Sequence, residues 1–263
     1  MSQRGFTLLE MALVITVVGI LIGGGLLAVG PLIDKTNVTK TNTTMDQVEN
    51  ALELFVIRNP RLPCPADGSL PANNANYGLE QPQGGGACTV AATNSVIPWR
   101  TLGIDESYSI DAWGNRLSYY ASQAGAAGAT TSATSGNPAL THSGNSYPIG
   151  TFMTVTNVSS TTQPVTPPPA NSSDQAAYVL ISHGKSGWYG WGKNGVQHVA
   201  SYAGGAKGCN NNPATCAVVA NSYFTGNWTG SYPPSSNTYF DDILRWRSAA
   251  FIIQMCGTLS CGN

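Results

Sequence analysis

The hydrophobic residues of this chain are concentrated in one long segment near its N-terminus. From Phe6 to Ile33 nearly every residue is apolar, and Glu10 is the one charged residue among them. As a helix, the segment would be about 42 Å long, against roughly 30 Å for the hydrocarbon core of a bilayer. The pattern therefore predicts a membrane-anchoring helix, with the rest of the chain on one side of the membrane.

The following segment, up to Asn59, has an amphipathic pattern. Its apolar residues recur mostly at spacings of three and four, as on one face of a helix. Pro60 disfavours helical backbone at the residue before it, so the helix should end near Arg58 or Asn59. We expect one helix of about 50 residues, longer than most globular helices. Its second half would turn an apolar stripe toward a globular head: Val38, Met45, Val48, Leu52, Phe55 and Val56.

The remainder of the chain has short strand patterns between loops rich in turn residues. The expected strands are Leu117–Ala121, Phe152–Val158, Tyr178–Ser182 and Val196–Ala200. The tail from Tyr239 to Gln254 mixes apolar and charged residues and fits a strand or a short helix. The predicted class is α+β, with a long N-terminal α-helix packed on an antiparallel β-sheet head that has long decorated loops.

Composition narrows the possible partners. Charged residues make up 10% of the chain, and 12 basic and 13 acidic side chains leave a net charge of −1. A strongly basic surface for nucleic acid is thereby excluded, and we expect no nucleic-acid partner. The 30 Gly and 16 Pro agree with a head rich in loops.

Glu10 distinguishes the N-terminal segment from an ordinary signal or anchor. A secretory signal has an apolar stretch of about 7–15 residues, and this one is much longer. A simple anchor explains the length but not a carboxylate, which costs about 2.5–3.5 kcal/mol at the centre of a bilayer. An ionisable residue at such a position is a candidate functional residue.

The residues from Gly5 to Glu10, G-F-T-L-L-E, resemble the processing site of the type IV pilin and pseudopilin family. The resemblance implies that a prepilin peptidase cleaves between Gly5 and Phe6 and that Phe6 is then N-methylated. It also implies that Glu10 pairs with the Phe6 amine of a neighbouring subunit in a filament, which offsets the burial of both charges. The chain would then divide into a leader (1–5), a transmembrane and assembly half-helix (6–33), an amphipathic half-helix (34–59) and a head (60–263).

The same resemblance implies a location and partners. The precursor would be a single-pass inner-membrane protein, with its N-terminus cytoplasmic and its head periplasmic, and would later join a periplasmic or cell-surface filament. Its partners would be prepilin peptidase, an inner-membrane assembly platform and other pilin-like subunits in a homo- or hetero-polymer.

Three head segments are similar to segments of type II secretion major pseudopilins. They are Asp111–Tyr119, which contains D-A-W-G-N, Tyr178–Gly184, and Phe240–Trp246, which contains D-D-I. In that family the loop near the last segment binds calcium, and Asp241 and Asp242 are the matching acidic residues. Two carboxylates are too few for the six to eight oxygen ligands of calcium, so backbone carbonyls would have to complete the site. Alternatively the pair is a solvated turn or contacts Arg245 and Arg247.

Departures from that family favour a minor or specialised subunit. Ala112 replaces a proline, the chain is longer than a major pseudopilin, and the head carries six cysteines. An even number of cysteines in an exported head suggests disulfides in an oxidising compartment. Zinc is disfavoured because the chain has no C-x-x-C pair and its histidines are scattered. Proximity in sequence suggests the pairs Cys64–Cys88, Cys209–Cys216 and Cys256–Cys261, one of several possible connectivities.

Motifs of catalysis are weak in this sequence. The segment from Gly187 to Lys193 approaches a phosphate loop, but Asn194 replaces the required Ser or Thr. The favoured interpretation of Gly187–Gly195 is an aromatic turn, with Trp188, Tyr189 and Trp191 packing or forming a recognition surface. The histidines at 142, 183 and 198 lack a neighbouring nucleophile and acid. We expect a non-enzymatic structural subunit of a type IV pilus or type II secretion pseudopilus. A tip or surface-binding pilin, for adhesion or cargo recognition, is the main alternative, and a membrane-anchored hydrolase is a weaker one.

Overall fold

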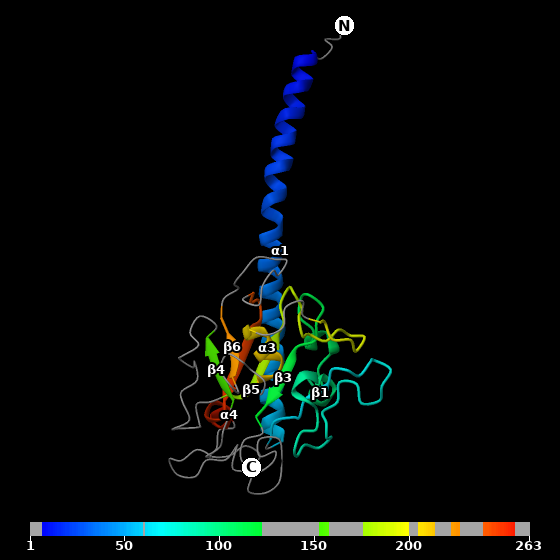
Figure 1. The fold of residues 1–263 in the computed structure, drawn as a ribbon, viewed down its shortest axis with the longest axis vertical. Coiled ribbons are helices and arrows are strands. Elements are labelled where there is room, and N and C mark those ends of the chain that lie inside the picture. The colour runs from blue at the N-terminus through cyan, green and yellow to red at the C-terminus, as the bar shows by residue number, and fades with distance from the viewer. Residues whose placement is uncertain are drawn as a thin grey trace.

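The protein is a long helix whose C-terminal half packs against a head (Figure 1). The computed structural model describes residues 7–59, 61–122, 153–157, 176–199, 205–213, 222–226 and 239–255. The helix α1 spans Leu8–Arg58 without interruption and includes Pro31. Its N-terminal half projects away from the head.

Both ends of α1 have a local cause. Thr7 is the N-cap, and it forms a capping box with Glu10, so two backbone donors of the first turn are satisfied. At the other end Asn59 is extended, and its backbone N–H donates to Phe55 O. The predicted end of the helix at Arg58–Asn59, just before Pro60, is therefore confirmed.

The head is built on an antiparallel sheet of five strands in the order β1-β2-β3-β5-β7. A second, parallel pair joins β4 to β6. The strands are β1 (Ala66–Asp67), β2 (Ser95–Val96), β3 (Ser118–Ala121), β4 (Thr154–Asn157), β5 (Ala176–Ser182), β6 (Ser222–Thr225) and β7 (Ile243–Ser248). The short helices are α2 (Trp99–Leu102), α3 (Gly205–Asn211) and α4 (Ala249–Met255), with 3-10 turns η1 (Ala92–Asn94) and η2 (Glu106–Ser109). The predicted α+β class is thus confirmed.

Three of the expected strands are present as β3, β4 and β5, but the strand expected at Val196–Ala200 is wrong. Up to Val199, this segment instead closes a small hairpin, in which Gly192 N donates to Val196 O and His198 N donates to Gly190 O. Local pairing across a tight turn removes these groups from the sheet. The tail from Tyr239 to Gln254, which fitted either a strand or a short helix, contains both the strand β7 and most of the helix α4.

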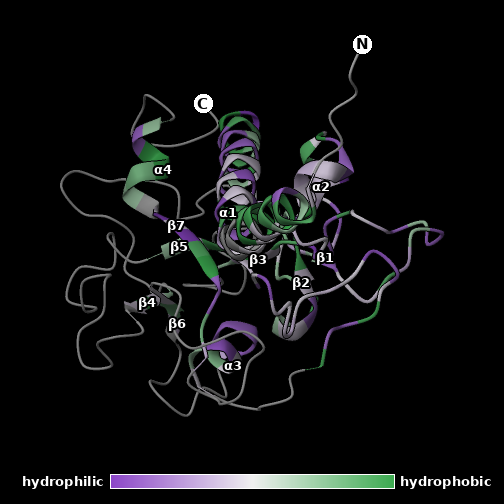
Figure 2. Ribbon diagram, turned by 90° about the horizontal axis from the view of Figure 1, so that it is seen from above, coloured by the Kyte–Doolittle hydropathy of each residue, from purple (hydrophilic) through white to green (hydrophobic). Residues whose placement is uncertain are grey.

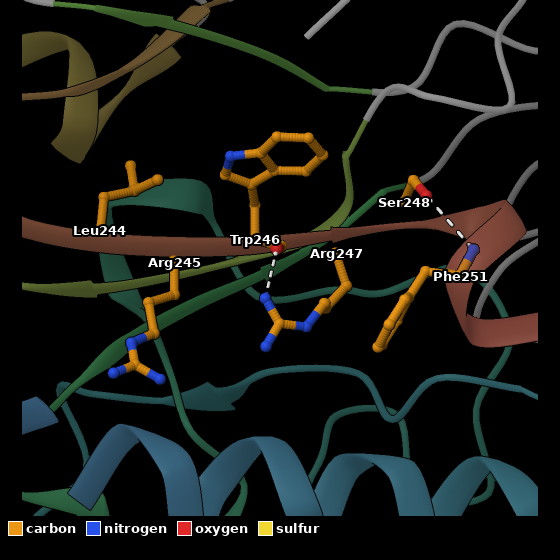
Figure 3. Close-up of a pocket in the computed structure, with 6 residues that line it drawn as sticks. All are labelled: Leu244, Arg245, Trp246, Arg247, Ser248 and Phe251. Carbon is orange, nitrogen blue, oxygen red and sulfur yellow. Dashed lines mark hydrogen bonds between the residues drawn. The ribbon is translucent and has the colours of Figure 1, made fainter. Parts of the chain in front are cut away.

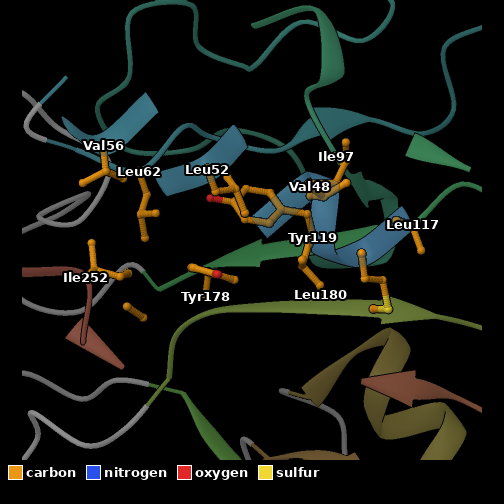
Figure 4. Packing of buried hydrophobic residues seen from close by; sticks show 12 residues of the cluster. Val48, Leu52, Val56, Leu62, Ile97, Leu117, Tyr119, Tyr178, Leu180 and Ile252 are labelled. Atoms are coloured by element: carbon orange, nitrogen blue, oxygen red, sulfur yellow. The ribbon is translucent and has the colours of Figure 1, made fainter. Parts of the chain in front are cut away.

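The main core lies between α1 and one face of the sheet (Figure 4). Tyr119 of β3 and Tyr178 and Leu180 of β5 point to the helix, and Ile252 of α4 closes one end. Alternate residues of the same strands point away from it, because successive strand side chains face opposite sides. The helix contributes Met45, Val48, Leu52 and Val56. Each such buried side chain contributes about 1.5–3 kcal/mol, so the C-terminal half of α1 is an integral part of the head.

The second face of the sheet is covered by β4 and β6. Tyr120, Val179 and Ile181 pack there against Val155 of β4 and Tyr223 of β6. Figure 2, viewed along α1, shows the resulting layers: helix, main sheet and the β4–β6 pair. Burial on both sides explains why every residue of β5 is buried and why the strand is almost wholly apolar.

Candidate functional site

The first candidate site is the start of α1. Glu10 lies in the first helical turn, where its Oε2 accepts from Thr7 N at 2.9 Å and Thr7 Oγ1 at 3.0 Å. The backbone N–H of Glu10 in turn donates to Thr7 Oγ1 at 3.2 Å. A carboxylate suits a helix N-terminus, where the backbone dipoles leave partial positive charge. Gly5 and Phe6 lie outside the described residues, so cleavage between them, methylation of Phe6 and its pairing with Glu10 stay predictions.

The N-terminal half of α1 presents apolar side chains that the head does not cover. The large apolar residues within Leu8–Ile22, together with Leu32 and Ile33, are between 45% and 93% exposed. They are Leu8, Leu9, Met11, Leu13, Val14, Ile15, Val17, Val18, Ile20, Leu21, Ile22, Leu32 and Ile33. In the part of the chain that the structure describes, no helix combines the length and the hydropathy of a membrane span. The predicted membrane span at 6–33 is therefore not confirmed.

Polar contacts fasten α1 to the head where the apolar segment ends. Lys185 Nζ lies 2.8 Å from Asp34 Oδ2. The turn that contains the D-A-W-G-N motif also contacts the helix, because Ala112 N donates to the buried Thr41 Oγ1 at 3.1 Å. The head thus contacts α1 from Asp34 onward, close to the predicted boundary between the two half-helices.

The D-A-W-G-N motif forms a turn held by Asp111. Its Oδ1 accepts from Trp113 N at 3.0 Å and Asn115 N at 2.9 Å, and its Oδ2 accepts from Ser182 Oγ at 2.7 Å. Gly114 has φ +92°, which a residue with a Cβ rarely adopts. Burial raises the pKa of Asp111 to about 6 although these hydrogen bonds oppose the shift. The motif therefore serves as a structural turn between α1 and β5.

A second cluster contains the two residues predicted to bind calcium. Asp241 and Asp242 are buried just before β7, and Lys207 of α3 lies between them. Lys207 Nζ is 2.6 Å from Asp241 Oδ1 and also contacts Asp242 Oδ1. Asp241 accepts three more hydrogen bonds, from Ser186 N, Ser186 Oγ and Tyr239 OH. Calcium stays a prediction, but the interpretation of the pair as a solvated turn is wrong.

His183 adjoins this cluster and completes an arrangement that the sequence did not predict. Its Nε2 lies 2.9 Å from Ser118 Oγ, and its Nδ1 lies 3.9 Å from Asp242 Oδ1. Burial, reinforced by the Lys207 ammonium, lowers the pKa of His183 to about 3, so the imidazole is neutral near pH 7. The residues resemble a nucleophile–base–acid set, but 3.9 Å exceeds a hydrogen bond and all three side chains are buried. The expected hydrolase alternative gains no support from them.

The arginines of β7 face α1 and not the aspartates. Arg245 contacts Asp46 and lies 3.1 Å from Glu49, and Arg247 lies 2.9 Å from Glu49. The alternative in which these arginines contact Asp241 and Asp242 is therefore wrong, because alternate residues of β7 point toward the helix. Figure 3 shows both guanidinium groups turned to α1 along a pocket of about 590 Å³, with Trp246 on the other side of the strand.

The described cysteines are in disulfides. Cys64 and Cys88 form the predicted bond, with Cα atoms 5.4 Å apart. Cys209 is disulfide-bonded as well. Its partner and the other predicted pairs involve Cys216, Cys256 and Cys261, which lie outside the described residues. The Gly187–Gly195 segment is also as expected, since Trp188 and Trp191 are buried and pack within the head.

Comparison with known proteins characterises the N-terminal segment. Residues 1–26 match the model of the prokaryotic N-terminal methylation motif, which is the signature of type IV pilins and pseudopilins. No curated protein and no solved structure matches the chain significantly. The match contains Gly5, Phe6 and Glu10 and stops before the head begins.

Proposed function

We propose that this chain is a pilin-like structural subunit that prepilin peptidase processes between Gly5 and Phe6. The mature chain assembles through α1 into a type IV pilus or a type II secretion pseudopilus. One observation carries the proposal: a helix that starts in the methylation motif is apolar and uncovered in one half and packed into the head in the other. An uncovered apolar half-helix requires another apolar environment, first lipid and then the helices of neighbouring subunits.

The proposed route follows from the position of the head. Insertion of residues 6–33 leaves the leader on the cytoplasmic side, where the peptidase acts, and places the disulfide-bonded head in the oxidising periplasm. The inner-membrane assembly platform then adds the subunit to the filament. The departures of the head from major pseudopilins support a minor position in that polymer.

The proposal is tested by Gly5→Ala in the native host. The extra methyl group beside the scissile bond should block cleavage, so the precursor should keep its leader and remain outside filaments. Intact-mass spectrometry distinguishes the two forms, because the mature chain begins with N-methylated Phe6. Ser2→Ala, elsewhere in the leader, is the matched control and should be processed normally. Full processing of the Gly5→Ala chain would contradict the proposal.

A further inference from the structure

The buried site at Asp241 and Asp242 is not suited to a divalent cation. Each of the four carboxylate oxygens already accepts a hydrogen bond from a protein donor. Asp241 Oδ2, for example, accepts from Ser186 N at 2.7 Å, and Asp242 Oδ2 accepts from Asn210 Nδ2 at 2.8 Å. Calcium needs six to eight oxygens whose lone pairs face the ion, and here those lone pairs face N–H and O–H groups.

The Lys207 ammonium lies where such an ion would lie. Besides the two carboxylates, Lys207 Nζ donates to the backbone oxygen of His183 at 3.2 Å, so its three partners are all oxygens. The side chain is 3% exposed. Burial disfavours the charge of Lys207, but Asp242 and Asp241 outweigh burial and raise the lysine pKa, so the ammonium form persists.

While the Lys207 side chain is in place, the surrounding backbone leaves little room for the coordination shell of a metal ion. Gly184 has φ +64°, and a Cβ at this position would lie 2.2 Å from Asp241 O. The loop after β5 is therefore packed directly on the acidic residues. His183 Nδ1 also points into the cluster without a hydrogen-bond partner among the described residues. The imidazole of His183 is neutral because it is buried and because the ammonium of Lys207 is nearby, as expected if Lys207 is the cation of this site.

We propose that the Asp241–Asp242 site is a cation site whose resident cation is the ammonium of Lys207, so that the head does not require calcium. The lysine links α3 to the segment before β7, as a bound metal ion would link two loops. Truncation of Lys207 to Ala should expose a latent site for a divalent cation, because Asp242 Oδ1, the His183 carbonyl oxygen and Asp241 Oδ1, which keeps its hydrogen bond from Ser186 Oγ, would then line a space that water can enter to supply the remaining ligands.

The test uses the full chain in detergent, with thermal unfolding and bound metal measured after dialysis against EDTA and then with millimolar calcium. The wild-type chain should keep the same Tm in both conditions and contain no stoichiometric calcium by elemental analysis. Lys207→Ala should lose stability in EDTA and regain part of it with calcium. Lys207→Met, which fills the space without a charge, should lower the Tm by roughly 6–20 °C and show no recovery, because it leaves uncompensated carboxylates.

Two outcomes would overturn the proposal. One is a wild-type chain that binds one calcium per molecule or loses stability in EDTA. The other is a folded Lys207→Ala chain that binds no calcium. If Lys207→Ala does not fold, the double variant Lys207→Met/Asp242→Asn tests whether Lys207 is the resident cation. It should be more stable than Lys207→Met alone, because it removes one of the two unpaired charges, and equal stability would reject the pairing.

Discussion

Asp111 shows how one buried carboxylate organises the turn that contacts α1. It accepts hydrogen bonds from two backbone N–H groups and from Ser182, yet burial still raises its pKa to about 6. Its pKa in the unfolded chain is about 4, so the folded chain binds the proton more tightly. The stability from this proton is complete below about pH 4 and is lost as the pH rises through about 6.

Asp111→Asn should therefore weaken the pH dependence of stability. An amide keeps an oxygen for the two backbone donors and does not ionise. Between pH 4 and pH 7 the wild-type chain should lose up to about 3 kcal/mol of unfolding free energy as Asp111 ionises, and the variant should not. The difference in unfolding free energy between variant and wild type should therefore shift by that amount in favour of the variant. Urea unfolding at several pH values measures the difference. Asp105→Asn, at an exposed cap, is the control and should show no such gain. If the unfolding free energies of Asp111→Asn and wild type changed in parallel with pH, the expectation would be refuted.

Sequence reasoning at the residue scale finds groups joined by short motifs and misses those joined by the fold. The methylation motif at residues 1–26 and the Cys64–Cys88 pair follow from local patterns. Lys207 lies in a Gly- and Asn-rich segment without periodicity, 35 positions from Asp242, and nothing in that segment indicates a buried charge. The contact exists because α3 packs beside β6 and the loop before β7, which no local pattern specifies.

Among the elements, α1 was predictable from its helical periodicity, and β3, β4 and β5 were predictable from short runs rich in aromatic and β-branched residues. The strands β1 and β2 have two residues each and no pattern to detect. They exist because the chain after α1 is held in place by other contacts. Arg61 forms a buried, bidentate ion pair with Glu80 at 2.7 Å, and the disulfide between Cys64 and Cys88 closes the same loop.

Removing this disulfide should destabilise the loop and the strands that depend on it. Cys64→Ala/Cys88→Ala opens a loop with a sequence separation of 24, so the free energy of unfolding should fall by about 3 kcal/mol. Equilibrium urea unfolding of the full chain in detergent measures the loss. Gln83→Ala, at an exposed position in the same loop, should change the stability by less than about 0.5 kcal/mol. An unchanged midpoint for the double variant would show that the ion pair alone suffices.

The whole molecule joins two surfaces of opposite character through one continuous helix. Most large apolar residues of the head are buried, chiefly in two cores, while the described large apolar side chains of the projecting half-helix remain exposed. The sequence predicts this division because hydropathy changes abruptly at Asp34. It does not predict how the β4–β6 pair covers the sheet, since that pairing joins distant segments.

At this scale Glu10 should govern incorporation and not folding. Glu10→Ala removes the carboxylate proposed to pair with a neighbour's Phe6 amine, and no head residue among those described hydrogen-bonds to it. The variant should reach the membrane fraction normally and be depleted at least tenfold from sheared filaments, as a loss of about 1.4 kcal/mol or more would produce. Quantitative blotting of both fractions is the measurement. Met11→Leu is the control, and undiminished filaments with Glu10→Ala would reject the pairing role.

The polar contacts between β7 and α1 have a mechanical consequence. Arg245 contacts Asn42, Asp46 and Glu49, and Arg247 contacts Glu49 as well, so two adjacent cations hold about two turns of one helix. If the chain assembles into a filament as proposed, tension along that filament would act on these bonds as shear, with all of them loaded side by side. Sliding of β7 along α1 would then require the bonds to rupture together, in addition to the core packing of α1, and such parallel loading resists pulling forces better than single contacts in series.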